Sequence, residues 1–197
     1  IKGSLIGKRL TEINSSQKIT WGEWKNLYPE TELLKHDGVH TVGFDSYISY
    51  HNSLDQTGIH IVENRDDRLK PKTTVIGIEI DNAKKAYPLG LFKNNRIIID
   101  NFQDTPLLLC HDISTNSTVV FSRKVDNKIV EFKEQNTTQL KKSNEFVITD
   151  TVTNTKWDLN SGKAIDGELK GSSLKRVNFK KVYWFIWADY YPETNIY

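Results

Sequence analysis

The chain has 197 residues, enough for one domain with a substantial core, and 27 Lys plus Arg against 25 Asp plus Glu leave a formal charge of +2. So balanced a charge gives no basic field for nucleic acid, and no apolar run approaches the ~20 residues of a membrane span. Hydrophobic residues at 37% argue against disorder, and one cysteine excludes an intramolecular disulfide. We therefore expect a single domain over residues 1–197 that binds no nucleic acid and has no membrane span.

The first predicted element is a short helix whose sequence pattern returns near the other end of the chain. The pattern Trp-x-x-Trp-x-x-x-Tyr-Pro-Glu-Thr occupies residues 21–31 and again residues 184–194. Positions i, i+3 and i+7 share one helical face, and Pro disfavours helix at the residue before it. Thr20 and Glu23 form a candidate capping box. We expect helices over residues 20–28 and 182–191, both packing their aromatic faces on one core.

Residues 36–70 follow, and they predict a long irregular excursion within the domain. The segment is rich in His, Asn, Asp and Gly and shows no clear period. A loop of that length is uncommon in a compact domain unless it is functional. Four of the five histidines fall here, at His36, His40, His51 and His60. Surface histidines are the simpler interpretation, and a metal site built from two or three of them is the alternative.

From residue 73 onward most of the chain is predicted as strands, because short runs of β-branched, apolar and aromatic residues alternate with turn residues. The runs are residues 73–80, 96–100, 106–111, 117–123, 128–133, 145–149, 155–159 and 174–179. Asp126 and Asn127 predict a tight turn that joins two of them in an antiparallel hairpin. The pattern predicts a mainly β (β-rich α+β) fold, as a curved antiparallel sheet, a sandwich or a partly open barrel, with short helices near both termini.

Charged residues at the ends of predicted strands form a candidate ligand site with one indole. The candidate residues are Asp100, Arg123, Asp150, Trp157 and the earlier pair Asp67 and Arg68. Carboxylate and guanidinium groups orient a ligand through charge-assisted hydrogen bonds, and an aromatic face adds contact area. The same residues could equally form a structural ion-pair network.

Cys110 and His111 suggest a different chemistry, because thiolate and imidazole are metal ligands and nucleophiles. Neighbours on a strand point to opposite faces, which favours Cys110 as a small core residue and His111 as a hydrogen-bonded histidine at the sheet edge. The alternative is a single copper, zinc or iron ion bound by His111, Cys110, His51 and His60. Otherwise no cofactor is expected.

Three glycines late in the chain, Gly162, Gly167 and Gly171, fit turns around residues 164–166 that require positive φ. They do not follow a strand in a phosphate-binding pattern, and no Lys-Ser or Lys-Thr closes such a loop. The sequence also carries no nucleophile elbow, zinc-protease helix or EF-hand motif. Nucleotide binding and the familiar hydrolase chemistries are therefore disfavoured.

Several motifs in order along the chain resemble the domain of unknown function 3179 family. They are Tyr87-Pro88-Leu89, residues 97–100, residues 121–123, Asp150-x-x-Thr153-x-Thr155-x-Trp157, the glycine-bearing stretch 162–174 and the closing residues 184–194. The resemblance implies a prokaryotic protein that often carries an export signal or lipoprotein leader, and it implies no settled activity. Many relatives carry Cys-x-x-Cys where this chain has Asp112 and Thr115, so a dithiol role is not carried over.

Two hypotheses about function follow. The first is an extracytoplasmic binding module, with a polar and aromatic pocket for an unknown small molecule or partner protein. The second is a metalloprotein or redox enzyme that uses the His and Cys ligands. The chain starts at Ile1 and contains no Met. We expect a mature or trimmed form, extracytoplasmic or membrane-anchored through a leader absent from this chain.

Overall fold

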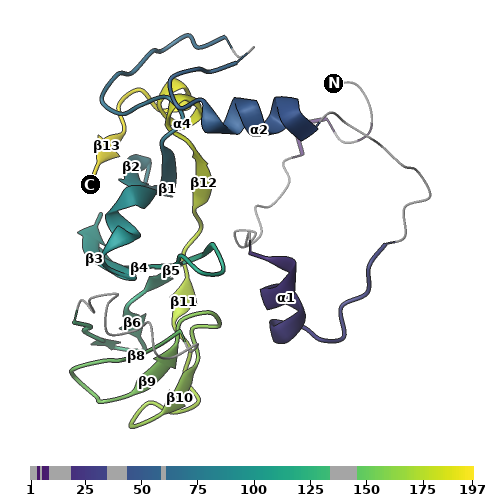
Figure 1. Ribbon diagram of the computed structural model, residues 1–197. Helices are drawn as coiled ribbons and strands as arrows, with labels where there is room; N and C mark the ends of the chain where they lie inside the picture. The colour runs from purple at the N-terminus through teal and green to yellow at the C-terminus, as the bar shows by residue number, and fades with distance from the viewer. Residues whose placement is uncertain (1–3, 5, 9–18, 35–43, 59–60, 134–145) are drawn as a thin grey trace.

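Strands dominate the computed structural model (Figure 1), which describes residues 4, 6–8, 19–34, 44–58, 61–133 and 146–197. Strand accounts for 37% of residues and helix for 15%, which confirms the mainly β prediction. Several antiparallel sheets form, and none of them closes into a barrel within the described chain. No helix in the part of the chain that the structure describes is long and apolar enough to cross a membrane.

In the part of the chain that the structure describes, the strands form three sheets and one small hairpin. Sheet 1 has the order β12-β1-β2-β13, from β12 (Lys180–Tyr183), β1 (Thr74–Ile80), β2 (Ala83–Pro88) and β13 (Asn195–Ile196). Sheet 2 has the order β11-β5-β4-β3, from β11 (Lys175–Arg176), β5 (Ser117–Ser122), β4 (Thr105–Asp112) and β3 (Ile97–Phe102). Sheet 3 contains β10 (Ala164–Asp166), β9 (Lys156–Asp158) and β8 (Val147–Thr149), and the hairpin pairs β6 (Lys124–Val125) with β7 (Lys128–Ile129).

These sheets stack in layers, and α4 (Trp184–Tyr190) covers the outer face of sheet 1 (Figure 1). Val75 and Ala86 pack against α4, while Ile76 on the opposite face of sheet 1 packs against sheet 2. The far face of sheet 2 packs on Trp157 of sheet 3. β4 therefore lies between two apolar layers, which explains why its residues 106–111 form a continuous buried run rather than an alternating one.

The two copies of the Trp-x-x-Trp repeat fold alike. Each forms a seven-residue helix, α1 (Trp21–Leu27) or α4, which ends at the repeat Tyr. In each copy the second Trp indole donates to the repeat Thr hydroxyl at 2.9 Å. The second Trp and the Tyr also lie ring to ring, 4.6 Å apart in the first copy and 4.5 Å in the second. The predicted helix-and-turn unit is thereby confirmed twice, and Thr20 caps α1 as expected.

Packing separates the two copies. α4 buries four residues, whereas no residue of α1 is buried and Trp21 is 45% exposed. In Figure 1 α1 lies beside the stacked sheets, and Thr20 N donates to Thr115 O at 3.2 Å across the contact. The expectation that both helices pack on the core is therefore wrong for α1.

The sequence of α1 explains the difference. Gly22 and Lys25 stand where α4 has Phe185 and Ala188, both of which are buried. If α1 packed on the core as α4 does, Lys25 would place its charge in an apolar contact, which is costly without a partner. α1 therefore keeps the local fold of the repeat without the apolar surface that α4 buries.

Five further features differ from the prediction. The excursion over residues 36–70 contains a helix, α2 (Phe44–Asn52), because Phe44 and Ile48 recur at helical spacing. The helix predicted over residues 182–191 begins at Trp184, since Val182 and Tyr183 extend β12. β2 was not predicted, because its Lys-Lys pair breaks the apolar pattern.

The other two corrections concern turns. The Asp126-Asn127 turn exists, but the hairpin it closes is only β6 and β7, and β5 pairs with β4 and β11. Residues 164–166, expected in a turn, form β10. The glycines that flank this strand, Gly162 and Gly167, do adopt positive φ, as predicted.

Candidate functional site

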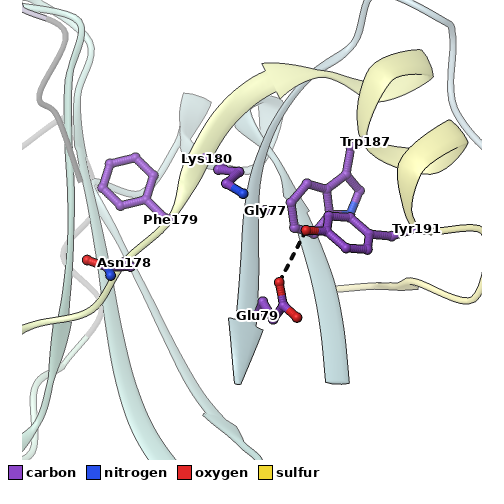
Figure 2. Close-up of a pocket in the computed structure, with 7 residues that line it drawn as sticks. All are labelled: Gly77, Glu79, Asn178, Phe179, Lys180, Trp187 and Tyr191. Atoms are coloured by element: carbon purple, nitrogen blue, oxygen red, sulfur yellow. Dashed lines mark hydrogen bonds between the residues drawn. The ribbon is translucent and has the colours of Figure 1, made fainter. Parts of the chain in front are cut away.

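A pocket of about 160 Å³ lies on the outer face of sheet 1, beside the C-terminal end of α4. We call it the Trp187 pocket. Figure 2 shows its lining residues, Gly77, Glu79, Asn178, Phe179, Lys180, Trp187 and Tyr191. Aromatic and polar side chains therefore share one small space, an arrangement typical of ligand sites.

Strand alternation brings the pocket residues to one face. On β1, Gly77 and Glu79 are two residues apart and so point the same way. The antiparallel register pairs Gly77 with Lys180 of β12, which places Lys180 on that face too. A Cβ at Gly77 would overlap the ring of Trp187, so the glycine lets the indole lie against the strand backbone.

The two charged side chains that line the pocket differ in their partners. The Glu79 carboxylate pairs with Lys84 at 3.2 Å and accepts a hydrogen bond from the Tyr191 hydroxyl at 3.2 Å (Figure 2). Lys84 also lies over the Tyr191 ring, 5.4 Å from its centroid. The Lys180 ammonium makes no ion pair with any residue that the structure describes. The pocket thus offers one anchored carboxylate and one ammonium open to a ligand.

Asp100, the first of the residues predicted from sequence, lies in a different network. Its carboxylate pairs with Lys85 at 2.6 Å and accepts a hydrogen bond from the Tyr87 hydroxyl at 2.6 Å. Burial alone would raise the pKa of Asp100, but these two hydrogen bonds outweigh it and hold the pKa below its usual range. Burial, together with Asp100, raises the pKa of Tyr87. Lys85 also lies over the ring of Tyr197, so the cluster fastens the C-terminal end of the chain to β2 and β3.

Arg123 connects sheet 2 to the β6–β7 hairpin. Its guanidinium donates to the carbonyl oxygens of Leu107 and Val130, each at 3.2 Å, and pairs with Glu131 at 2.5 Å. The residue is 6% exposed. These bonds tie Arg123 to β4 and to residues 130–131, whereas the Asp100 carboxylate pairs with Lys85.

Asp150 and Trp157 are the two predicted residues that the structure brings together. The Trp157 indole donates to the Asp150 carboxylate at 3.0 Å. The same carboxylate accepts from the backbone of Val152, Thr153 and Thr155, at 3.0, 2.6 and 3.1 Å. Burial would raise the pKa of Asp150, but these hydrogen bonds lower it. The pair holds the turn between β8 and β9.

Asp67 and Arg68 have separate partners. Asp67 pairs with Arg65 at 2.9 Å, and both side chains are exposed. Arg68 donates to Thr194 O at 2.9 Å and lies 5.3 Å from the centroid of the Trp184 ring. Arg68 therefore helps to hold α4 on sheet 1. The six predicted residues are distributed over five networks, and each network is made of contacts within the fold.

Cys110 and His111 point to opposite layers, as strand alternation predicts. Cys110 is fully buried in the core between sheets 2 and 3, and burial raises the pKa of its thiol. The Nδ1 atom of His111 shares a hydrogen bond of 3.0 Å with the Thr118 hydroxyl, and the ring packs edge-on against Phe92. Burial, with a contribution from Lys181, lowers the pKa of His111 to about 4. The two side chains therefore do not share one site.

The other proposed metal ligands are less fully described. His51 shares a hydrogen bond with the Tyr183 hydroxyl at 2.6 Å. His60 lies outside the described residues, as do His36 and His40. Across the described ranges, no three His, Cys, Asp or Glu side chains gather closely enough to hold a metal ion. A metal site that includes His60 stays a prediction.

Acidification is expected to destabilise the protein through His111. The pKa of His111 is about 4 in the folded protein, against about 6.5 for an unperturbed histidine. Its contribution to stability is complete above pH 6.5 and is lost as the pH falls towards 4, because the unfolded state binds the proton first. Urea unfolding measures the free energy of unfolding at pH 7.0 and at pH 4.5. The decrease between the two pH values should be about 2 kcal/mol larger for the parent than for His111→Gln. An equal decrease in the free energy of unfolding for the parent and for His111→Gln would show that a group other than His111 causes the acid destabilisation.

Glu79 and Lys180 are the pocket residues that sequence reasoning missed. Both stand in strands as ordinary charged residues, and their convergence depends on the register of β1 with β12. A partial signal was available, since the repeat singles out Trp187 and Tyr191. The missing step was the strand identity of residues 180–183.

Comparison with known proteins identifies a family that the chain matches over nearly its whole length. A family model described as "Protein of unknown function (DUF3179)" covers residues 1–194. No curated protein and no solved structure matches the chain.

Proposed function

Because the chain belongs to the DUF3179 family of proteins of unknown function, its activity must be inferred from its own site, and we propose that it is a binding module for a small polar molecule. The observation that supports the proposal is the Trp187 pocket, where an ammonium open to a ligand and an anchored carboxylate lie beside aromatic walls. Polar groups fix the orientation of a ligand and aromatic side chains supply contact area.

Pocket size supports a small ligand. Sites for drug-sized molecules have volumes of about 300–1,000 Å³. The Trp187 pocket has about 160 Å³, so it suits a molecule no larger than one sugar ring or one amino acid. Gly77, Glu79, Lys180 and Trp187 stand on β1, β12 and α4, elements that pair or pack on one another.

We also propose that this binding takes place outside the cytoplasm. The support for this part is the resemblance to exported prokaryotic proteins, which carry a leader sequence.

Thermal denaturation tests the binding proposal. We expect at least one of D-glucose, L-leucine, 4-methylpentanoate and 3-methylbutylamine, each at 10 mM, to raise the melting temperature. A ligand present at ten times its Kd should raise it by about 3–6 °C, because it binds only the folded state. The Glu79→Gln/Lys180→Gln double variant should lose the shift. The matched control, Glu63→Gln/Lys175→Gln, removes the same charges from exposed positions and should keep it. An unchanged melting temperature with all four compounds would refute the proposal.

A further inference from the structure

We infer that the natural ligand of the Trp187 pocket is a zwitterion of the amino-acid type, with its ammonium group on Glu79 and its carboxylate on Lys180. This inference rests on the proposed function and specifies its ligand class. It follows from the signs, positions and partners of the two charged side chains, taken with the apolar side chains between them.

The positions of the two charged residues on the sheet suit a short dipolar ligand. Gly77 faces Lys180 across the β1–β12 ladder, and Glu79 is two residues further along β1. Glu79 and Lys180 are therefore diagonal neighbours, whose backbone positions are about 7–8 Å apart on one face of an antiparallel pair. Two charge-assisted hydrogen bonds of about 2.8 Å, one at each end of the ligand, fit within the reach of such a pair.

The partners of each charge favour a zwitterion over a simple ion. Lys84 and the Tyr191 hydroxyl hold the Glu79 carboxylate in place, and each carboxylate oxygen still has capacity to accept a further hydrogen bond. A simple anion on Lys180 would lie close to this negative charge. A simple cation on Glu79 would leave the Lys180 ammonium unpaired beside it. A molecule that carries both charges satisfies both side chains.

The aromatic residues of the pocket determine which side chain the bound amino acid should carry. Trp187, 2% exposed, and the half-buried Phe179 line the pocket together with the charged pair. In Figure 2 Trp187 and Phe179 lie on opposite sides of Lys180. An amino acid bound through its two charges can place an aliphatic side chain against these rings, where apolar contact is favourable. The expected ligand is therefore an amino acid with a small or medium aliphatic side chain.

Titration calorimetry with three compounds of one shape tests the inference. L-leucine carries both charges, 3-methylbutylamine lacks the carboxylate, and 4-methylpentanoate lacks the amine. The parent protein should bind leucine at least about tenfold more tightly than either analogue, since each lost charge removes one charge-assisted bond. Lys180→Gln should bind leucine and the amine equally, and Glu79→Gln should bind leucine and the acid equally. The control Lys175→Gln, an exposed lysine on β11, should behave as the parent.

The outcomes separate this inference from the proposed function. If D-glucose or one of the singly charged analogues binds as tightly as leucine, and the Glu79→Gln/Lys180→Gln variant loses that binding, the pocket is a ligand site but the zwitterion assignment is wrong. If none of the four compounds binds at 10 mM, both the ligand class and the proposed function fail. Tight leucine binding that survives both single substitutions would also overturn the assignment.

Discussion

Replacing Trp184 by alanine is expected to lower the free energy of unfolding by about 3–5 kcal/mol, the usual cost of removing a large buried aromatic side chain. Trp184 is 0% exposed and packs on Val75 and Ala86 of sheet 1. Its indole donates to Asp66 O at 3.0 Å, so the truncation also removes the donor of a part-buried carbonyl oxygen. Urea unfolding followed by far-ultraviolet circular dichroism measures the loss without relying on tryptophan fluorescence.

The repeat supplies a matched control at Trp21. This residue holds the same position in the repeat and starts a helix of the same length, but it is 45% exposed. Trp21→Ala should therefore change the free energy of unfolding by less than about 1 kcal/mol. Equal losses for the two variants would show that α1 is packed in solution as α4 is, contrary to the fold described above.

Substituting Asp150 by asparagine is expected to cost about 3 kcal/mol at pH 7. The Asp150 Oδ2 atom accepts from the Thr155 amide, the Thr153 hydroxyl and the Trp157 indole. An amide nitrogen at that position would face these donors with another donor, and each buried donor left unsatisfied costs about 1–3 kcal/mol. A turned amide would only move the conflict to the donors on Oδ1, the Val152 and Thr153 amides.

The effect of this substitution should depend on pH. Because the folded pKa of Asp150 lies below its usual range, the stability it contributes is complete above about pH 4, the unfolded pKa, and is lost as the pH falls through the folded pKa. The difference between the parent and Asp150→Asn should therefore shrink below pH 4. Asp126→Asn, in the exposed β6–β7 turn, is the control and should change stability by no more than about 0.5 kcal/mol at any pH. A constant difference down to pH 2 would contradict this role of the carboxylate.

Local structure was predictable where neighbouring residues determine it. The repeat indicated both helices and the residues at which they end, and Thr20 indicated where α1 begins, since Thr20, Pro29 and Pro192 act within a few residues of their own position. Burial of the helices was not predictable from the shared pattern. It depends on the residues between the aromatic ones, and Lys25 in place of Ala188 was the signal that was overlooked.

In the candidate site, too, contacts between residues close in sequence were predictable, whereas contacts between distant strands were not. Asp150 and Trp157 were grouped correctly because a short turn joins their strands. Asp100 was grouped with the wrong partners, because its neighbours Lys85 and Tyr87 belong to β2, a strand without an apolar alternation. Contacts set by the pairing of distant strands need the register, which composition and periodicity do not provide.

The central claim, a small-molecule site in the Trp187 pocket, is tested most directly by the indole N–H signals of the ¹⁵N-labelled protein. The chain has five tryptophans, and they probe the exposed helix, the core and the pocket at once. On titration with L-leucine, the account predicts a saturable shift of the Trp187 signal, while the signals of Trp21 and Trp157 stay unchanged. A Trp187 signal that does not move with up to 10 mM L-leucine, D-glucose, 4-methylpentanoate or 3-methylbutylamine would contradict the claim.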